Sequence, residues 1–321
     1  MRAPYDPDLL AGMETMRQCF EPVPLRADTI GPSREHVDKL LATLPRPQSA
    51  AVAWREASVI GPGGNEVALT IALPRQGAPG AQGAPAVYII HGGGMVLGNR
   101  SMTAPQAAEL VERHGAVVVS VEYRLAPEHP FPAGLEDCYT GLTWFAERAG
   151  ELGADPGRIL VTGTSAGGGL AAGLALLARD RGGPPLIGQL LDAPMIDDRN
   201  DTASSRQYDG IGVWDRNDNL TAWAALLGAA AGGPDVSPHA APARETDLSR
   251  LPPTFIEVGA AEVFRDEAIK YALALGAAGT PCELHVYEGA HHGFAGFSAQ
   301  AAVSRLAVQA RQNWLDRLLA R

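Results

Sequence analysis

Lysine, cysteine and long apolar runs are scarce in this chain of 321 residues. Its only lysines are Lys39 and Lys270, its formal net charge is −10, and it has no basic run, so nucleic acid and anionic membranes are not expected as partners. The first twenty residues lack the continuous apolar core of a signal peptide, and no apolar stretch is long enough to cross a bilayer. We therefore expect a cytoplasmic protein.

Metal ligands and disulfide-forming residues are equally sparse. The three cysteines, Cys19, Cys138 and Cys282, are too few and too far apart to frame a disulfide scaffold or a metal site. His291 and His292 are adjacent rather than spaced along one face of a helix, and no H-E-x-x-H motif occurs. The sequence therefore predicts chemistry that uses no metal ion.

The first third of the chain contains helices before any strand. Apolar spacing predicts two amphipathic helices, over residues 6–20 and 33–44. The turn-forming "GPGGN" between 51–60 and 65–74 then predicts an antiparallel hairpin. A low-complexity stretch at 75–85 is expected to form an exposed loop.

From residue 86 onward, short apolar runs alternate with helical stretches. This alternation is typical of βαβ units and a mostly parallel, buried sheet, so the predicted fold class is α/β. The predicted strands are 86–90, 116–121, 158–162, 186–191, 253–258 and 282–287. Between about 197 and 245 the rhythm breaks into a polar, glycine-rich and partly helical segment, which we interpret as an insertion lying over the sheet.

The clearest chemical signal is a G-x-S-x-G motif in "ILVTGTSAGGGLAAG", where a strand runs into a helix. Small residues on both sides permit the strained turn of a nucleophile elbow, which would present Ser165 at the edge of the sheet. The start of the helix would also direct the amide of Ala166 at a developing oxyanion. A flexible glycine loop is the alternative interpretation, and the flanking strand and helix disfavour it.

A second glycine cluster, "HGGG" at residues 91–94, follows the first parallel strand. Consecutive glycines let the backbone approach a substrate and turn its N–H groups inward. A plain tight turn has the same composition. Beside Ser165, however, the cluster would supply the second half of an oxyanion hole.

A histidine base and an acid complete the candidate site. His291 and His292 lie in the loop after the last strand, and the order nucleophile, acid, histidine is that of α/β-hydrolases. The acid would then follow the preceding strand, in "VGAAEVFRDE". There Glu262 lies in the turn, whereas Asp266 and Glu267 begin a helix and suit its positive N-terminus. We expect Glu262 to orient the histidine and Asp266 to cap the helix, with Asp266 as the rival acid.

Together the motifs resemble those of the hormone-sensitive-lipase-like bacterial esterases of the α/β-hydrolase fold. The shared motifs are "HGGG", "VEYRLAPEHPFPAGLEDC", "GTSAGG", "APMIDDRND", the turn around Glu262 and "HHGF", and they span about residues 80–320. Threonine before the serine is typical of the branch with a GTSAG motif. The resemblance implies a helical cap segment at 1–48, a catalytic domain at 49–196 and 246–321, and a cap insertion at 197–245.

The same resemblance implies a role for each candidate residue. The implied site consists of the triad Ser165, Glu262 and His292 and of the oxyanion donors Gly93, Gly94 and Ala166. His292 is favoured because it stands directly before Gly-Phe, while His291 replaces a residue that is often proline. The family's acid is most often aspartate, but the longer Glu262 can still accept the histidine Nδ1–H. A shift of the oxyanion register by one residue, to Gly92, is the alternative.

The implied function is a carboxylesterase that hydrolyses short-chain esters, of roughly two to eight carbons, through an acyl-enzyme and without a cofactor. One alternative is the same triad acting on amides, carbamates, lactones or acetylated small molecules. A more remote alternative is a non-catalytic receptor for a small molecule, which occurs where family members lose the histidine. The apolar residues expected to line the substrate pocket are Met95, Val96, Tyr208, Val213 and Trp214. The resemblance also suggests a homodimer formed through the final strand and helix.

Overall fold

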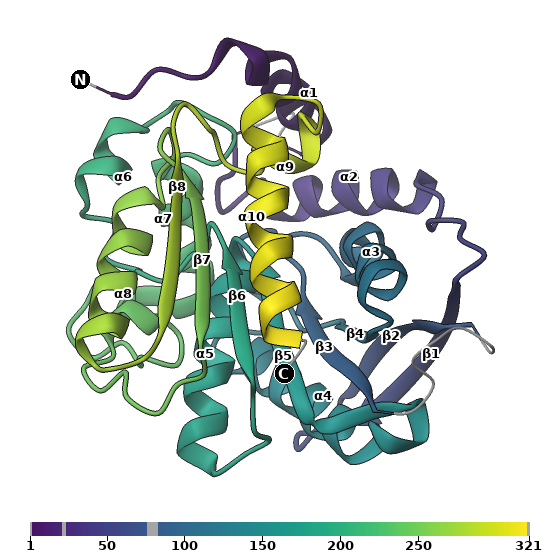
Figure 1. Ribbon diagram of the computed structural model, residues 1–321. Coiled ribbons are helices and arrows are strands. Elements are labelled where there is room, and N and C mark those ends of the chain that lie inside the picture. Colours follow the sequence, from purple (N-terminus) through teal and green to yellow (C-terminus); the bar gives the residue numbers. More distant parts are fainter. Residues whose placement is uncertain (1, 21–23, 76–82, 320–321) are drawn as a thin grey trace.

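The computed structural model describes residues 2–20, 24–75 and 83–319, and its centre is an eight-stranded sheet (Figure 1). The strand order is β1-β2-β4-β3-β5-β6-β7-β8, in which the pairs β1–β2 and β2–β4 are antiparallel and the others are parallel. The strands are β1 Val52–Ile60, β2 Glu66–Pro74, β3 Ala84–Ile90, β4 Val117–Val121, β5 Ala154–Thr164, β6 Gly188–Asp192, β7 Thr254–Gly259 and β8 Cys282–Tyr287.

The predicted α/β class, the hairpin and the six later strands are therefore confirmed. Their ends differ from the prediction by a few residues, most of all in β5, which begins at Ala154 instead of residue 158. The loop predicted at 75–85 lies mostly outside the described residues.

Helices cover both faces of the sheet, which explains why its central strands are mostly apolar. Every residue of β4, "VVVSV", is buried, as expected for a strand with no solvent-facing side. Helices α3 (Ala104–His114) and α10 (Ala302–Leu319) pack on one face, and α4 (Ala133–Arg148), α5 (Ala166–Arg181) and α8 (Arg265–Ala277) pack on the other. In Figure 1, α10 is the yellow helix that crosses in front of the sheet.

The N-terminal segment lies at the carboxyl ends of the parallel strands. It forms η1 (Pro7–Leu9), α1 (Leu10–Phe20) and α2 (Ile30–Thr43), which confirms the two predicted helices. The Asp6 amide donates to the Gly289 carbonyl, 3.0 Å away in the loop after β8. Leu9 is fully buried in a small cluster with Phe294, so this segment is anchored to that loop.

The segment between β6 and β7 is partly helical, as predicted for the break in strand rhythm. It contains α6 (Ala203–Gln207), α7 (Arg216–Leu227), η4 (Gly228–Ala230) and η5 (Pro242–Arg244). The remaining short helices are η2 (Arg100–Thr103), η3 (Gly150–Leu152) and α9 (Phe294–Phe297). None of the helices in the described part of the chain has the length and apolar character needed to cross a membrane.

Candidate active site

Ser165 occupies a sharp turn between β5 and α5, in the left-handed region that residues other than glycine rarely adopt. Its φ is 59°, and its amide donates to the Asp192 carbonyl at 2.8 Å. The Ser165 carbonyl accepts from the amides of Gly169 and Met195, both at 3.0 Å. A strained backbone persists where such bonds over-determine it, so the turn is a rigid support for the hydroxyl.

The "HGGG" loop follows β3 and packs directly against this turn. A Cβ placed on Gly92 would lie 3.4 Å from the Ser165 Cβ. Gly93 and Gly94 have positive φ angles of 108° and 62°, and a Cβ on Gly93 would come within 2.1 Å of the Leu97 carbonyl oxygen. Among the described residues, none accepts a hydrogen bond from the amides of Gly93, Gly94 or Ala166. These three N–H groups are thus available to an anion beside Ser165.

His292 lies in the loop after β8 and is paired with a carboxylate from the loop after β7. Its Nδ1 is 2.6 Å from Glu262 Oε2, and both side chains are buried. The second carboxylate oxygen, Glu262 Oε1, accepts from the Gly259 amide at 2.9 Å. His291 points elsewhere: its Nδ1 contacts the His292 carbonyl, and its ring meets Tyr5 edge-on. The structure therefore joins His292, and not His291, to Glu262.

The other two carboxylates of "VGAAEVFRDE" have structural partners. The prediction that Asp266 caps its own helix is wrong, because α8 begins after Phe264 and Asp266 accepts a hydrogen bond from the Ser204 amide at 2.8 Å. It therefore serves the N-terminus of α6. Glu267 is buried and accepts from the Ile196 amide at 2.9 Å, and burial raises its pKa well above the ordinary value.

The candidate residues lie at the carboxyl ends of four neighbouring parallel strands. Ser165 follows β5, Asp192 ends β6, Glu262 follows β7 and His292 follows β8. No hydrogen bond between Ser165 Oγ and His292 is present among the described residues. Such contacts are often long before a substrate binds, and they tighten in the reacting complex.

A second group of charged side chains lies near the carboxyl ends of these strands, and the sequence did not predict it. Arg311 of α10 donates from Nε to Glu257 Oε1 at 2.6 Å and lies 3.7 Å from Asp192 Oδ2. The Thr164 hydroxyl, directly before the serine, donates to the same Asp192 oxygen at 3.2 Å. The available signal was Glu257 itself, a carboxylate inside the apolar strand "PTFIEV"; nothing in the local pattern marked Arg311.

Burial and charge act in opposite directions on these groups. Burial lowers the pKa of His292, but the Glu262 carboxylate, its hydrogen bond and Asp192 together outweigh burial and raise that pKa above 6.5. Burial raises the pKa of Glu257 to about 7, although Arg311 opposes the shift. Burial also raises the pKa of Asp192, against Arg311 and His292. The site therefore favours a charged imidazolium once His292 accepts a proton.

The five expected pocket residues are all buried, but they lie in different surroundings. Trp214 lies against the "HGGG" loop, since a Cβ on Gly94 would be 2.3 Å from its ring. Tyr208 donates its hydroxyl hydrogen to the Ala3 carbonyl at 3.0 Å. A cavity of about 1010 Å³ between α2, α7 and the loop at 127–131 includes neither these five residues nor the triad candidates. Their assignment to a substrate pocket stays a prediction.

The fold, the elbow, the paired histidine and carboxylate and the glycine loop define the class as α/β-hydrolase. A family model described as alpha/beta hydrolase fold matches residues 87–296. Esterase LipI of Mycobacterium tuberculosis is 36% identical to this chain, over 87% of the chain and 86% of LipI. Carboxylesterase NlhH of the same species is 41% identical over 67% of each protein.

Solved structures give the same result. The structure titled "Bacterial Heroin Esterase" is 38% identical to this chain, covers 98% of both chains and superimposes with a TM-score of 0.88. The structure of esterase LipW from Mycobacterium marinum is 34% identical, with a TM-score of 0.76 over 99% of this chain and 92% of LipW. The chain belongs to the hormone-sensitive-lipase-like family of carboxylic ester hydrolases.

Removal of Arg311 tests the charge balance beneath the site. Glu257 and Asp192 are mostly buried, and Arg311→Met removes the cation that faces both of them. We expect a loss of about 3–5 kcal/mol in the free energy of unfolding near neutral pH. Because both carboxylates already have raised pKa values in the folded protein, they take up protons as the pH falls, which removes the uncompensated charge. Urea titrations should therefore give a smaller loss at pH 5 than at pH 8.

Arg317→Met, on the same helix, is the matched control. Arg317 pairs with Glu283 at the surface, where 55% and 36% of the two side chains are exposed, so its loss should cost less than about 1 kcal/mol. A loss in Arg311→Met that equals the control, or that is the same at both pH values, would contradict the charge-balance account.

Proposed function

We propose that this chain is a serine carboxylesterase whose triad consists of Ser165, Glu262 and His292. The observation that carries the proposal is the 2.6 Å contact between His292 Nδ1 and Glu262 Oε2. This contact lies at the carboxyl ends of the parallel strands, as does the turn that holds Ser165. A buried carboxylate that accepts the Nδ1–H leaves Nε2 as the base, and it stabilises the imidazolium that forms. Family membership supports the same reaction class.

The reaction proceeds in two steps. Ser165 Oγ attacks the ester carbonyl carbon while His292 Nε2 takes the hydroxyl proton. The carbonyl oxygen becomes an oxyanion and accepts hydrogen bonds from the amides of Gly93, Gly94 and Ala166. The carbon–oxygen bond to the alcohol then breaks, and His292 protonates the departing alkoxide. Water repeats this sequence on the acyl-enzyme and releases the carboxylic acid.

The two segments outside the sheet form, in our proposal, a cap over this site, with residues 1–48 on one side and 197–245 on the other. Their contact with each other supports it: the Leu25 amide donates to Asp218 Oδ1 at 3.3 Å, and the Thr221 hydroxyl donates to the Leu25 carbonyl at 3.2 Å. Trp214 then covers the loop between β3 and η2, residues 91–99, from the same side. We call this segment the oxyanion loop.

Acylated small molecules are the second candidate substrate class, acted on by the same triad. The observation in favour is the similarity to the structure titled "Bacterial Heroin Esterase", whose title names a drug molecule as its substrate. Amides, carbamates and lactones are further bonds that the same serine could attack.

Glu262→Gln tests the assignment of the acid. The amide cannot stabilise the imidazolium, and we expect kcat for p-nitrophenyl butyrate to fall by roughly 10³–10⁴-fold. The pH profile should move as well. The raised pKa of His292 puts the acid limb of kcat/KM above pH 6.5 in the native protein, and without Glu262 burial lowers that pKa, so the limb should shift to lower pH.

Asp266→Asn is the matched control, because Asp266 contacts Ser204 and Arg265 and not His292. We expect its kcat to stay within about threefold of the native value. A large loss in Asp266→Asn together with a fully active Glu262→Gln would transfer the role of the acid to Asp266.

The cap should limit the length of the acyl chain. Tyr208 and Trp214 of the proposed cap and Met95 of the oxyanion loop are all buried, so a long acyl chain would have to displace packed side chains. We expect p-nitrophenyl esters of roughly two to eight carbons to be hydrolysed fastest, with a steep decline beyond. Equal rates on emulsions of long-chain triglycerides would contradict this.

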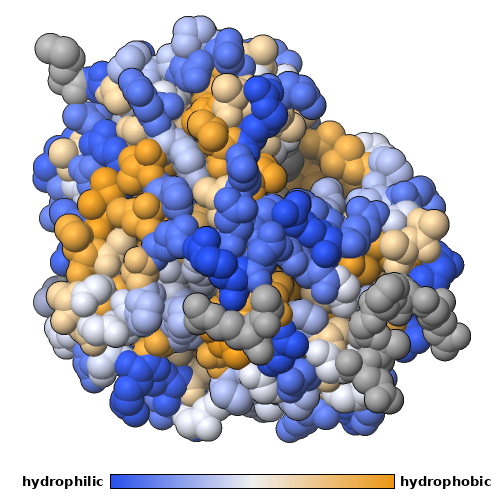
Figure 2. Space-filling model, in the orientation of Figure 1, coloured by the Kyte–Doolittle hydropathy of each residue, from blue (hydrophilic) through white to orange (hydrophobic). Residues whose placement is uncertain are grey.

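The proposed homodimer would form through β8, which is the last strand in the order of the sheet, and the final helix α10. Leu273 of α8 is 70% exposed and Val286 of β8 is 39% exposed, and Figure 2 shows hydrophobic surface on the side where these elements lie. An exposed edge strand with apolar neighbours can pair with a second copy. Sedimentation velocity should therefore give a dimer, and a single monomer peak at micromolar concentration would remove the proposal.

A further inference from the structure

The oxyanion loop contains three consecutive residues in the left-handed region, and five of its carbonyl groups accept hydrogen bonds. Gly93, Gly94 and Met95 have φ angles of 108°, 62° and 64°. Such a turn persists only when its surroundings hold it in place. The holding bonds are Tyr123 Oη to His91 O (3.0 Å), His91 Nδ1 to Gly92 O (2.8 Å), Leu97 N to Gly93 O (2.8 Å), Ala126 N to Met95 O (2.9 Å) and Arg34 Nε to Val96 O (2.9 Å).

Only Arg34, among these donors, comes from outside the part of the chain that forms the sheet and its loops. It lies on α2, with 22% of its side chain exposed. While Nε holds the Val96 carbonyl, Nη2 donates to the Ala126 carbonyl at 2.7 Å. The Ala126 amide in turn donates to Met95 O. The planar guanidinium of Arg34 therefore links two backbone segments, one around Val96 and one around Ala126, that also bond directly to each other.

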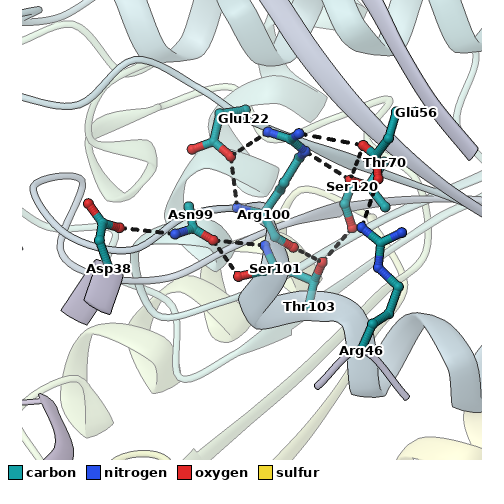
Figure 3. Close-up of polar contacts among 10 residues, drawn as sticks. All are labelled: Asp38, Arg46, Glu56, Thr70, Asn99, Arg100, Ser101, Thr103, Ser120 and Glu122. Carbon is teal, nitrogen blue, oxygen red and sulfur yellow. Dashed lines mark hydrogen bonds and ion pairs between the residues drawn. The ribbon is translucent and has the colours of Figure 1, made fainter. Parts of the chain in front are cut away.

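The same face of α2 holds the loop at a second point. Asp38, one turn after Arg34, accepts a hydrogen bond from Asn99 Nδ2 at 3.0 Å. Figure 3 shows this contact and, next to it, Arg100, which donates to Glu122 and Thr70 on the sheet side. The end of the oxyanion loop is thus fixed between α2 and the strands.

We propose that Arg34 is a positioning residue that sets the direction of the oxyanion-hole amides from α2. The inference rests on the proposed serine mechanism and adds to it a dependence of the chemical step on the N-terminal helix. Hydrogen bonds to an oxyanion are effective only when the donors are held at the correct distance and angle. Loss of the bonds from Arg34 to the Val96 and Ala126 carbonyls would let the backbone of the oxyanion loop move. The amides of Gly93 and Gly94 would then no longer be held in the direction of the oxyanion.

The ion pair between Arg34 and Glu128 is a separate interaction that a control can remove. Arg34 Nη1 is 3.0 Å from Glu128 Oε2, and 55% of the Glu128 side chain is exposed. Glu128→Gln removes this pair and leaves both carbonyl contacts in place. Lys39→Ala removes another cation of α2, whose side chain is 79% exposed and pairs with Glu35.

The test compares Arg34→Ala with these two controls on p-nitrophenyl butyrate. Three quantities are measured: kcat, KM and the inhibition constant of butylboronic acid, which forms a tetrahedral adduct on a serine and puts an oxygen in the oxyanion hole. We expect Arg34→Ala to lower kcat by roughly 10–100-fold and to weaken the boronic acid by a similar factor, with little change in KM. Added guanidinium ion should restore part of kcat. Both controls should stay within about twofold of the native protein.

Other results would overturn the proposal. If Arg34→Ala lowers the melting temperature but leaves kcat and boronic acid inhibition unchanged, Arg34 is only structural. If Glu128→Gln reproduces the loss, the ion pair and not the carbonyl contacts is responsible. If Arg34→Ala does not fold, Arg34→Lys keeps the charge but cannot reach both carbonyls, and a native kcat in that variant would also overturn the proposal.

Ser165→Ala, measured beside these variants, separates this inference from the proposed function. Full activity in Ser165→Ala would overturn the serine mechanism and the positioning role that rests on it. An inactive Ser165→Ala together with an unaffected Arg34→Ala would overturn the positioning role alone.

Discussion

The close approach of α5 to the end of β5 constrains the backbone around Ser165. A Cβ on Gly163 would lie 2.3 Å from the Gly167 carbonyl carbon, and a Cβ on Gly167 would lie 2.1 Å from the Ile90 carbonyl oxygen. Only glycine allows these contacts, and they hold Ser165 at its positive φ. The ends of β3 and β6 are thereby fixed against the elbow. The "HGGG" loop that follows β3 consequently meets Ser165 at close range.

Charge is the second constraint, because several carboxylates converge where the parallel strands end. Glu262, Asp192 and Glu257 lie in this region, and burial raises the pKa of Asp192 and of Glu257, so both are less stable as anions there than in water. Arg311 reaches this group from α10 and offsets part of their repulsion. The negative charge of Glu262 and Asp192 raises the pKa of His292, which suits the role of proton carrier that we propose for it.

The segments outside the sheet contact the loop that, in our proposal, holds the oxyanion donors. Helix α2 contacts the loop through Arg34 and Asp38, and the segment around α7 contacts it through Trp214. If these segments form the cap, then the elements that shape the substrate pocket also hold the oxyanion donors. Substitutions that widen such a pocket would therefore change kcat as well as KM, because packed elements transmit displacement.

The sequence by itself determined the fold class, the strand positions and the two glycine motifs, because apolar periodicity and glycine placement act between near neighbours. Its helix-start rule failed at Asp266, whose carboxylate serves Ser204, 62 residues away. Only the tertiary structure decided this contact. The same holds for the contact of Arg311 with Glu257, 54 residues apart in the sequence, and for that of Arg34 with Val96, 62 residues apart. The physical reason is that such partners depend on which elements pack together, and that packing leaves no periodic mark in the sequence.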